Sequence, residues 1–549
     1  MNPGPRAYQA RALPAKLPWH KKYLKSGIIN FFVSEDKLLK RISLSFSMGE
    51  IHWADVVAKK LLERGNKHRI ATGISPSGHI HMGNLREMLT ADAIRRALID
   101  ANGEAEIIFI ADTFDPLRRR YPFLPQEYEN YVGMPLSEIP DPEGCHKNYS
   151  DHFLTPFLES LEILGIDVTL KKADEMYKEG RYNEAIKISF EKRKKIIEIL
   201  REVTGRDVDD DWYPYMAICK KCGKMNTTKV VDYDDSWIYY KCNCGYRGKA
   251  SYNGGGKLTW RVDWAARWWI LKISCEPFGK DHAAAGGSYD TGKRFAKEIF
   301  GIDPPFPVVY EWINLKGVGA MKSSKGIVIP VRDMVDVLPP EIVRYIIIKV
   351  KPERHIEFDP GISLLDLIDE FERALKLKDR AVELSMVKEV EYSDVSFRHL
   401  VIVGQIANWD VEKALEILQR TGYKIDEVVK KDVERRMSYA KKWLEKFAPD
   451  KIKFEVIKDV DKIKLEFNEK EREFLKSYAN KLHKDMNPEK IHTLVYEVAK
   501  DVTIKPSKAF QAIYKAILGK TFGPRVGYFI KSLGIEWVKD RFYSIYEKN

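Results

Sequence analysis

The chain of 549 residues lacks the features that mark a membrane protein or a secreted protein. No run of apolar residues approaches the roughly 18 that cross a membrane, and the first residues do not resemble a secretion signal. Cysteine is scarce as well, with six in the whole chain and four of these closely clustered. Without secretion features, such a cluster indicates metal ligands rather than disulfides. We therefore expect a cytoplasmic protein that does not contact a membrane.

Internal repeats and low-complexity tracts are also absent, and the composition, with 44% hydrophobic and 31% charged residues, is that of a globular protein. Single cores rarely exceed about 250–300 residues, so we expect several domains. The net charge of +12 is concentrated at the two ends. Residues 1–47 hold nine Lys and Arg against two acids, and residues 505–549 hold nine against three. These basic ends are compatible with a polyanionic partner.

A glycine-rich stretch at residues 71–84, ATGISPSGHIHMGN, stands between a short apolar segment and a segment with helical spacing. A strand, a glycine-rich loop and a helix in this order can cradle an anion on backbone N–H groups. A phosphate loop of the usual kind would carry Gly-Lys-Thr, but this loop carries His79 and His81. The pattern therefore indicates a nucleotide site that uses imidazoles.

Strands and helices alternate around this loop. Residues 106–112 and 307–310 are short apolar runs typical of buried parallel strands. Alternation of this kind predicts an α/β fold with a doubly wound parallel sheet, which binds ligands at the carboxyl ends of its strands. Asp112 follows such an end, where it either contacts a substrate or caps a helix.

Helical periodicity dominates the rest of the chain. One long helix is expected within the segment before the cysteines, at residues 183–203, and the region beyond residue 338 is expected to be all-helical. The stretches there with clear 3.6-residue periodicity are 362–384, 395–421, 428–447, 468–483 and 488–502.

Four cysteines form two close pairs, CKKC and CNC, nineteen residues apart. Four thiolates at these spacings fit a tetrahedral structural zinc with no open position. The expected ligands are Cys219, Cys222, Cys242 and Cys244. A second metal site is a weaker expectation, from Asp141, Cys145, His146 and His152.

Two motifs carry a resemblance to a known family. Residues 76–84, PSGHIHMGN, resemble the HIGH signature of class I aminoacyl-tRNA synthetases, with Asn84 in place of the second histidine. Residues 319–326, GAMKSSKG, resemble the KMSKS loop of the same class. From residue 48 to the C-terminus the chain is similar to the class I lysyl-tRNA synthetases of archaea and some bacteria.

The resemblance implies a Rossmann-type catalytic domain in two halves, residues 48–115 and 256–337. Between them, residues 116–255 form a zinc-containing insertion that reaches the acceptor end of tRNA, and residues 338–549 form a helical anticodon-binding domain. Residues 1–47 have two interpretations: a basic RNA-binding arm, or a segment outside the native protein if translation begins at Met48, where the resemblance begins.

The implied reaction is attack of an amino-acid carboxylate on the α-phosphate of ATP, which requires positioning and stabilisation of negative charge. The resemblance implies catalytic roles for His79, His81, Lys322 and Lys325. The implied ATP-binding residues are Pro76, Gly78, His81, Gly83, Asn84, Asp281, Ser323, Ser324 and Lys325. The usual first lysine of the loop is replaced by Ala320, so the identity of the catalytic lysine stays open, with Lys325 favoured and Lys322 assisting.

An aromatic run at residues 260–269, WRVDWAARWW, predicts an amino-acid pocket, because a carboxylate and an aromatic face together hold an ammonium group. The alternative is that most of these tryptophans lie in the core. The expected lysine-binding residues are Gly73, Ser75, Asp112, Trp260, Asp263, Trp264, His282 and Tyr310.

The resemblance thus implies an ATP- and Mg²⁺-dependent enzyme with a structural Zn²⁺, expected as a monomer, that joins lysine to tRNA(Lys). Class I enzymes for glutamate or arginine are the nearest alternatives, and a zinc-ribbon RNA-binding protein is a more distant one. The last 45 residues interleave basic and aromatic side chains, which suits the reading of unstacked anticodon bases.

Overall fold

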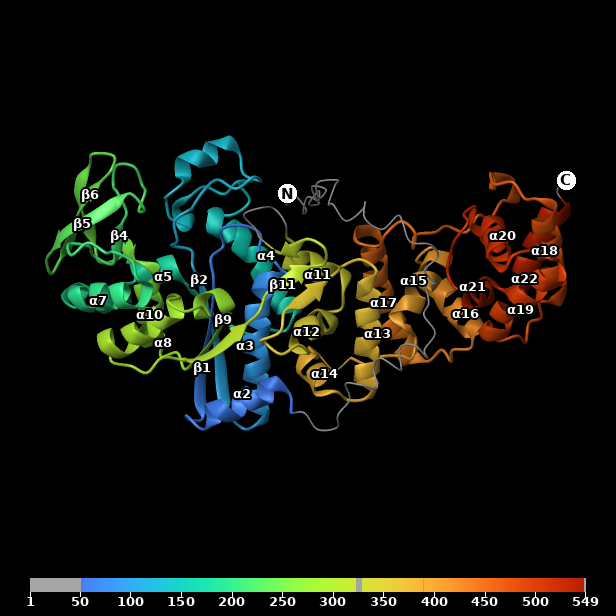
Figure 1. Cartoon of the computed structure of the whole chain (residues 1–549), viewed down its shortest axis with the longest axis horizontal. Coiled ribbons are helices and arrows are strands. Elements are labelled where there is room, and N and C mark those ends of the chain that lie inside the picture. The colour runs from blue at the N-terminus through green and yellow to red at the C-terminus, as the bar shows by residue number, and fades with distance from the viewer. Residues whose placement is uncertain (1–50, 322–327, 389, 548–549) are drawn as a thin grey trace, which may run out of the picture.

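The computed structural model describes residues 51–321, 328–388 and 390–547. The expected N-terminal extension and residues 322–327 of the KMSKS-like loop lie outside the described residues. The molecule is elongated, with an α/β part and a small antiparallel sheet at one end and a helical bundle at the other (Figure 1). In the described part of the chain, no helix is long and apolar enough to cross a membrane.

A five-stranded parallel sheet, in the order β10-β9-β1-β2-β3, forms the centre of the α/β part. Its strands are β1 (Lys67–Ile74), β2 (Glu104–Ala111), β3 (Thr169–Lys172), β9 (Cys275–Gly279) and β10 (Phe306–Tyr310). The chain runs outward from β1 through β2 to β3, and later adds β9 and β10 on the other side. This order confirms the doubly wound sheet, whose ligand crevice is expected at the carboxyl ends near β1 and β9.

Side chains on β1 and β2 alternate between two cores, as the two-residue period of a strand requires. Ile70 and Phe109 face one core, with α2 (Trp53–Leu62), α3 (Met82–Asp100) and α4 (Tyr149–Ile163). Ala71, Ile108 and Ile110 face the other core, with α6 (Asn183–Glu191), α7 (Arg193–Thr204) and α8 (Trp260–Leu271). The sheet is therefore covered on both faces.

The segment 116–255 is less separate from the catalytic fold than its sequence suggests, because β3 within it extends the central sheet. The expected single helix at residues 183–203 is wrong: α6 and α7 are two helices that meet at Lys192, which has φ −92° and ψ 19°. With this break, Phe190 contacts Tyr213 and also Tyr233, which lies in the small antiparallel sheet described below. Helix α7 packs on α10 (Ser288–Arg294). The domain boundaries stay predictions.

The small antiparallel sheet that carries the cysteine pairs consists of β5 (Thr228–Tyr233), β6 (Trp237–Cys242) and β7 (Arg247–Ser251). A two-stranded sheet, β4 (Tyr215–Ala217) with β8 (Gly256–Leu258), joins it to the catalytic part. A fourth sheet pairs β11 (Ile313–Leu315) with β12 (Gly319–Ala320) and β13 (Ile356–Phe358). Strand β12 is the start of the KMSKS-like loop.

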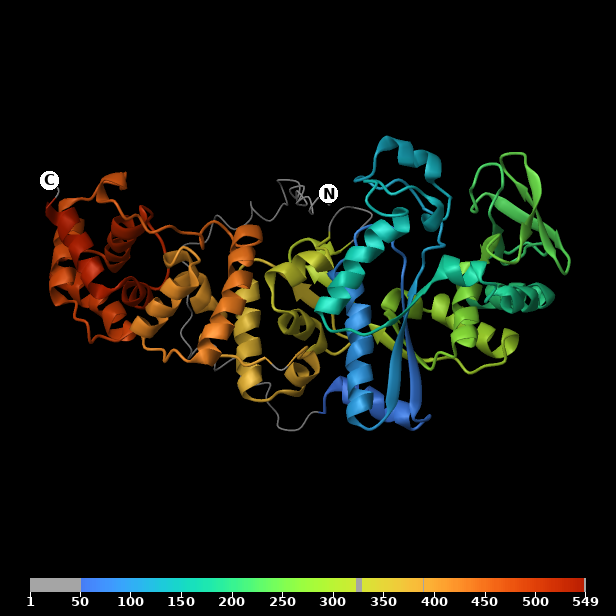
Figure 2. The same ribbon diagram turned by 180° about the vertical axis from the view of Figure 1, so that it is seen from behind.

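Helices dominate the remainder, as expected. Two predicted stretches, 362–384 and 395–421, are each a pair of helices. The helices are α11 Val331–Val337, α12 Pro340–Ile348, α13 Ser363–Lys376, α14 Arg380–Ser385, α15 Phe397–Ile406, α16 Val411–Thr421, α17 Glu427–Lys446, α18 Glu469–Lys481, α19 Pro488–Asp501, α20 Pro506–Leu518, α21 Val526–Leu533 and α22 Ile535–Glu547. Helices α18–α22 form a bundle with its own core at the end of the molecule farthest from the small antiparallel sheet (Figures 1 and 2).

The shorter helical segments lie in the connections. They are α5 Ala173–Lys178, α9 Lys280–Ala283, η2 Gln126–Tyr131, η3 Leu136–Glu138, η4 Phe295–Ile299 and η6 Val460–Lys462. Of these, α9 immediately follows β9 and so lies at the carboxyl edge of the central sheet, where it carries Asp281 and His282.

Candidate active site

The signature loop joins the end of β1 to the start of α3, and His81 caps that helix. Its Nδ1 accepts a hydrogen bond from the Gly83 N–H at 3.0 Å, and the Asn84 Oδ1 accepts one from the His81 N–H at 3.2 Å. His81 is only 8% exposed, and burial lowers its pKa to about 4. The ring is therefore neutral at pH 7. Because Nδ1 accepts, the proton is on Nε2, which makes His81 an uncharged donor.

The second position after His81 requires glycine while the ring keeps this place, because a Cβ on Gly83 would lie 2.8 Å from the His81 Cε1. The two histidines of the loop differ in exposure, because His81 is buried. His79 is exposed, with its ring 5.6 Å from that of Phe123 and 5.2 Å from that of Phe153. Desolvation lowers the pKa of His79.

The signature loop is hydrogen-bonded to the chain segment that follows the KMSKS-like loop. The Met82 N–H donates to the Ile329 carbonyl at 3.1 Å, and the Val331 N–H donates to the Ile80 carbonyl at 3.1 Å. The four loop residues expected to bind ATP or act in catalysis, Lys322, Ser323, Ser324 and Lys325, lie outside the described residues. Their C-terminal flank is nevertheless fixed beside the signature histidine.

An acid missed by the sequence analysis stands at the end of β1. Glu87 of α3 accepts hydrogen bonds from the Gly73 N–H at 2.6 Å and from the Tyr310 hydroxyl at 2.7 Å. Desolvation raises the pKa of Glu87 to about 8. The available signal was its position: Glu87 is one helical turn beyond Asn84, on a helix that starts in the signature.

A buried network of charges lies beside this acid. Arg267 of α8 is 2.7 Å from Asp112 and 3.2 Å from Asp263, and Lys257 is 3.0 Å from Asp263 and 2.6 Å from Asp115. Burial raises the pKa of Asp112, although Arg267 opposes the shift. Asp263 is fully buried and already paired with two cations, so it supports the wall of the pocket from behind. The i,i+4 spacing of Asp263 and Arg267 on α8 was a sequence signal for their pairing, whereas the pairings with Asp112, Asp115 and Lys257 had none.

The aromatic run divides between wall and core. The rings of Trp260 and Trp264 stack with centroids 5.4 Å apart, and the His282 ring lies 5.9 Å and 5.3 Å from them. Trp264 is buried, and its Nε1 donates a hydrogen bond to Glu276 at 2.9 Å. The Nε1 of Trp268 donates a second hydrogen bond to the same carboxylate. Burial raises the pKa of Glu276 to about 7. Trp260, which is partly exposed, is therefore the member of the run best placed to offer a ring face.

The remaining expected residues lie at the same carboxyl edge. Ser75, Pro76 and Gly78 form the loop between β1 and α3. Asp281 follows β9 and accepts a hydrogen bond from the Trp312 Nε1 at 2.9 Å. The structure thus places the described members of the two expected sets along one edge, at the ends of β1, β2, β9 and β10.

The two clusters of metal-ligand side chains are both assembled. The sulfur atoms of Cys219 and Cys244 are 3.6 Å apart, and those of Cys222 and Cys242 are 3.7 Å apart. Zn–S bonds of about 2.3 Å at tetrahedral angles require S···S distances of about 3.8 Å, so this set fits zinc. In the second cluster the ligand atoms of Asp141, Cys145, His146 and His152 all lie within 4.8 Å of one another.

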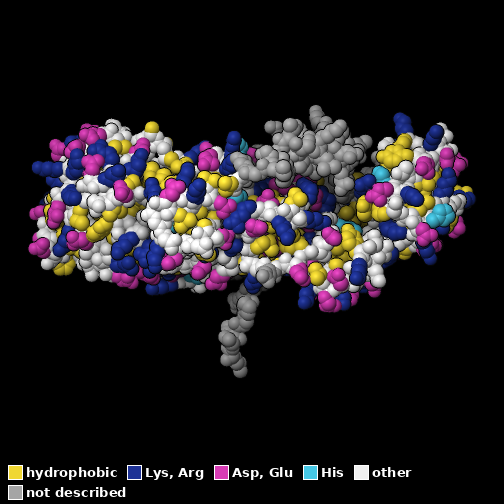
Figure 3. Space-filling view, turned by 90° about the horizontal axis from the view of Figure 1, so that it is seen from below, with side chains coloured by type: hydrophobic (Ala, Val, Ile, Leu, Met, Phe, Trp, Pro, Cys, Tyr) yellow, Lys and Arg dark blue, Asp and Glu magenta, His cyan; other side chains and the backbone are white. Residues whose placement is uncertain are grey.

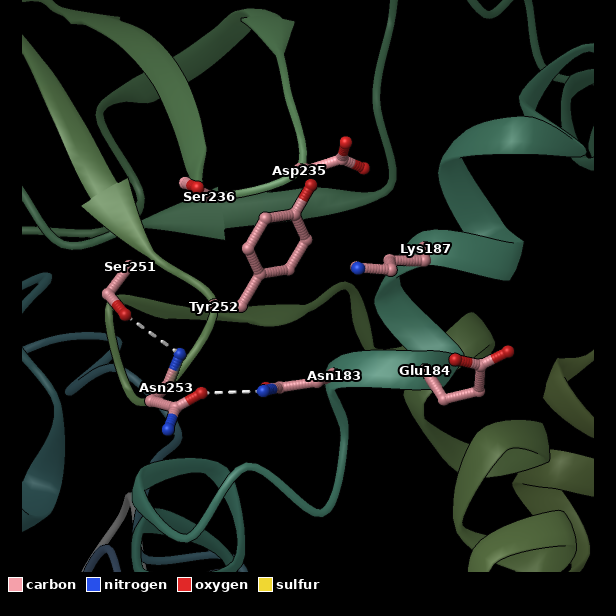
Figure 4. Close-up of a pocket in the computed structure, with 8 residues that line it drawn as sticks. All are labelled: Asn183, Glu184, Lys187, Asp235, Ser236, Ser251, Tyr252 and Asn253. Carbon is pink, nitrogen blue, oxygen red and sulfur yellow. Dashed lines mark hydrogen bonds between the residues drawn. The ribbon is translucent and has the colours of Figure 1, made fainter.

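A polar cavity of about 230 Å³ lies away from this edge, between α6 and the loops of the small antiparallel sheet. Figure 4 shows Lys187 of α6 directed toward Tyr252, with the Asn183 amide donating to Asn253 below them. It contains none of the expected catalytic or substrate-binding residues, so it is not the active site.

A parallel doubly wound sheet with a histidine- and glycine-rich loop at its carboxyl edge defines a nucleotide-binding α/β enzyme. A family model described as tRNA synthetases class I (K) matches residues 51–394, and a model described as anticodon binding domain matches residues 444–545. The chain therefore belongs to the class I (K) tRNA synthetase family, as the two sequence motifs predicted.

Curated relatives cover nearly the whole chain. It is 69% identical to a lysine–tRNA ligase of Archaeoglobus fulgidus over 89% of this chain and 99% of the relative. It is 45% identical to a lysine–tRNA ligase of Methanosarcina barkeri over 90% of this chain and 97% of the relative. A solved glutamate tRNA ligase from Elizabethkingia meningosepticum aligns over 88% of this chain and 99% of its own, at 14% identity and a TM-score of 0.38, too low to support an argument.

Proposed function

We propose that the protein is a lysine–tRNA ligase, which activates lysine with ATP and transfers the lysyl group to the 3′-terminal adenosine of tRNA(Lys). The observation that carries this proposal is the 69% identity, over nearly its full length, to a relative of that name. Glutamate and arginine enzymes of the same class are disfavoured by the same comparison.

Activation joins the lysine carboxylate to the α-phosphorus of ATP and breaks the bond to the β-phosphate, so that pyrophosphate leaves. Charge develops on phosphate oxygens, and donors fixed beforehand stabilise it without reorganisation. The neutral His81 supplies the Nε2–H for this role, and the first turn of α3 adds its dipole. Lys322 and Lys325 are proposed to hold the leaving pyrophosphate, and Mg²⁺ is expected to accompany ATP.

The amino-acid pocket is proposed to lie between Glu87, Tyr310 and Trp260. An ionised Glu87 attracts the lysine ammonium, the Tyr310 hydroxyl orients the carboxylate, and the Trp260 ring offers a cation–π face. A glutamate substrate would require a cation instead. Arg267, which flanks this part of the pocket, is already paired with two carboxylates. The pocket therefore favours a cationic side chain.

The other residues expected from the sequence keep supporting roles in this proposal. Gly73 and Ser75 line the entrance, and Asp112 and His282 contact the amino acid. Asp281, Pro76, Gly78, Gly83 and Asn84 serve ATP, with the serines at 323 and 324. The Cys219 cluster holds a structural Zn²⁺, and the Asp141 cluster holds a second metal ion. The protein is proposed to act as a cytoplasmic monomer, with tRNA(Lys) bound across the α/β part and the helical end.

Aminoacylation tests the proposal. Purified protein is incubated with ATP, Mg²⁺, total archaeal tRNA and each of the twenty amino acids in turn, with tRNA present throughout because related enzymes need it for activation. Lysyl-tRNA is the expected product. Charging with glutamate or arginine instead of lysine contradicts the substrate assignment. Failure to consume ATP with any amino acid favours the zinc-ribbon RNA-binding alternative.

A further inference from the structure

Three rings contact one another on the surface of the C-terminal bundle. His492 and Tyr496 stand one turn apart on α19, and Phe510 lies on the adjacent helix α20. Their ring centroids are 5.8 Å apart for His492 and Tyr496, 5.2 Å for His492 and Phe510, and 5.4 Å for Tyr496 and Phe510. We refer to these three side chains as the ring platform.

Tyr496 of the ring platform differs in exposure from the aromatic side chains of the bundle core. Phe529 and Phe542 are completely buried in the bundle core, whereas Tyr496 is 49% exposed. The two neighbouring aromatics toward α21, Phe522 and Tyr528, are 46% and 37% exposed. Packing of the bundle therefore does not account for the position of Tyr496. Because the three rings are in mutual contact, they form one continuous aromatic surface, which distinguishes Tyr496 from a single exposed side chain.

Positive charge borders the ring platform. The positive charge of Arg525 lowers the pKa of His492, and its guanidinium lies 5.9 Å from the centroid of the Tyr528 ring. The ammonium group of Lys520 lies 5.9 Å from the centroid of the Phe522 ring. Helix α20 begins with Lys505 at its cap and has no acid in its first turn. At the right-hand end of Figure 3, where the C-terminal helices lie, hydrophobic and histidine side chains lie among side chains of both charges.

The platform itself carries little charge. Burial lowers the pKa of His492, and Arg525 lowers it further, so the imidazole is neutral at pH 7. The nearest acid, Glu489, accepts a hydrogen bond from the Tyr528 hydroxyl at 3.2 Å. The surface therefore combines neutral ring faces with a cationic border.

We propose that the ring platform stacks an unpaired base of the tRNA anticodon loop, with the adjoining phosphates directed toward Arg525 and Lys505. This assignment rests on the proposed function. Every base has a π face, and stacking platforms beside cationic grooves are the usual means of binding single-stranded nucleic acid. A docked protein would require a continuous apolar surface, whereas these rings stand among lysines and an arginine. All these residues fall within the segment that matches the anticodon-binding model.

The test compares full-length Tyr496→Ala with Tyr496→Phe, which keeps the ring and removes only the hydroxyl. Tyr546→Ala on α22 removes another exposed ring of the bundle, 38% exposed against 49% for Tyr496, and is the matched control. Loss of one stacked base weakens binding by roughly tenfold to a hundredfold. For Tyr496→Ala we expect the KM for tRNA to rise by about that factor, with kcat and the KM for ATP and lysine unchanged. Tyr496→Phe and Tyr546→Ala should match the parent protein.

A second measurement separates this proposal from the proposed function. Binding of a fluorescent 17-nucleotide anticodon stem-loop to each full-length variant is followed by anisotropy, which requires no catalysis. Tyr496→Ala should weaken binding at every salt concentration, and Arg525→Gln should reduce the salt dependence by about one phosphate contact. Equal binding by Tyr496→Ala and Tyr546→Ala overturns the proposal, as does an equal loss in Tyr496→Phe. If lysylation fails but Tyr496→Ala weakens stem-loop binding, only the proposed function fails.

Discussion

Replacement of Glu87 by glutamine tests the partly buried acid at the centre of the proposed pocket. Folding raises the pKa of Glu87 from an ordinary value of 4.5 to about 8 because the carboxyl is desolvated. The raised pKa means that the folded state holds the proton more tightly than the unfolded state. The stability that Glu87 contributes is therefore fully present below pH 4.5 and is lost as pH rises toward 8.

The size of this effect follows from linkage. Each pH unit between the two pKa values costs at most about 1.4 kcal/mol, so the loss from pH 4.5 to pH 8 is at most roughly 5 kcal/mol. The Glu87 side chain is only partly buried, which makes this an upper bound. Glutamine preserves the shape and the polar contacts to Gly73 and Tyr310 but does not ionise. The stability advantage of Glu87→Gln should be near zero at pH 5 and grow steadily to pH 8.

Folding favours the protonated form of Glu87, whereas lysine binding should favour the ionised form. A lysine ammonium stabilises the ionised carboxylate, so below pH 8 lysine binding must expel a proton from Glu87. The KM for lysine should therefore fall by up to tenfold for each pH unit gained below pH 8. Glu87→Gln should bind lysine more weakly and lose this pH dependence.

Thermal unfolding from pH 5 to pH 8 and steady-state lysylation from pH 6 to pH 8, at saturating ATP and tRNA, measure both effects. Glu63→Gln, an exposed change on the surface of α2, is the control. Parallel stability profiles for the parent protein and Glu87→Gln would refute the reasoning, because a group that stays ionised in the folded state gives no such divergence.

Three further changes test the remaining features. His81→Ala removes the cap of α3 and should cost about 1 kcal/mol of stability while lowering the activation rate. Since the pKa of His81 is about 4, the activity of the parent protein should show no titration of this group between pH 5.5 and 8. A titration of activity with a midpoint near pH 6.5 that is absent from His81→Ala contradicts this. Cys222→Ala should release one equivalent of zinc, measured by metal analysis, and lower the melting temperature, whereas unchanged zinc content counts against the four-thiolate site. Arg267→Met leaves the buried Asp112 without its ion-pair partner, while Asp263 keeps Lys257, and should destabilise the protein by about 3–5 kcal/mol. Lys67→Met, which breaks an exposed ion pair, should change the melting temperature little.

Local pattern was sufficient for much of the fold. The apolar runs at 106–112 and 307–310 became β2 and β10 because a buried parallel strand needs apolar side chains on both faces. Local sequence pattern was insufficient where the packing of one element on another decided where a helix ends. Residues 183–203 have continuous helical periodicity, yet Lys192 interrupts the helix so that Phe190 packs against the small antiparallel sheet. Periodicity describes a single helix and carries no information about its neighbours.

The sequence by itself determined the class of the protein, since the signature loop, the KMSKS-like loop and the cysteine pairs are short patterns whose chemistry depends on spacing along the chain. It also predicted that the substrates bind at the carboxyl ends of the parallel strands. Only the tertiary structure decided the state of the acids at this edge. Desolvation raises the pKa of Glu87, which is hydrogen-bonded to Tyr310, whereas the charge of Asp263 is balanced by Arg267 and Lys257. The pKa of a carboxyl group depends on desolvation and on charges within a few ångströms. The i,i+4 spacing of Asp263 and Arg267 is a local pattern. Tyr310, however, reaches Glu87 from 223 residues away, and no local pattern encodes that contact.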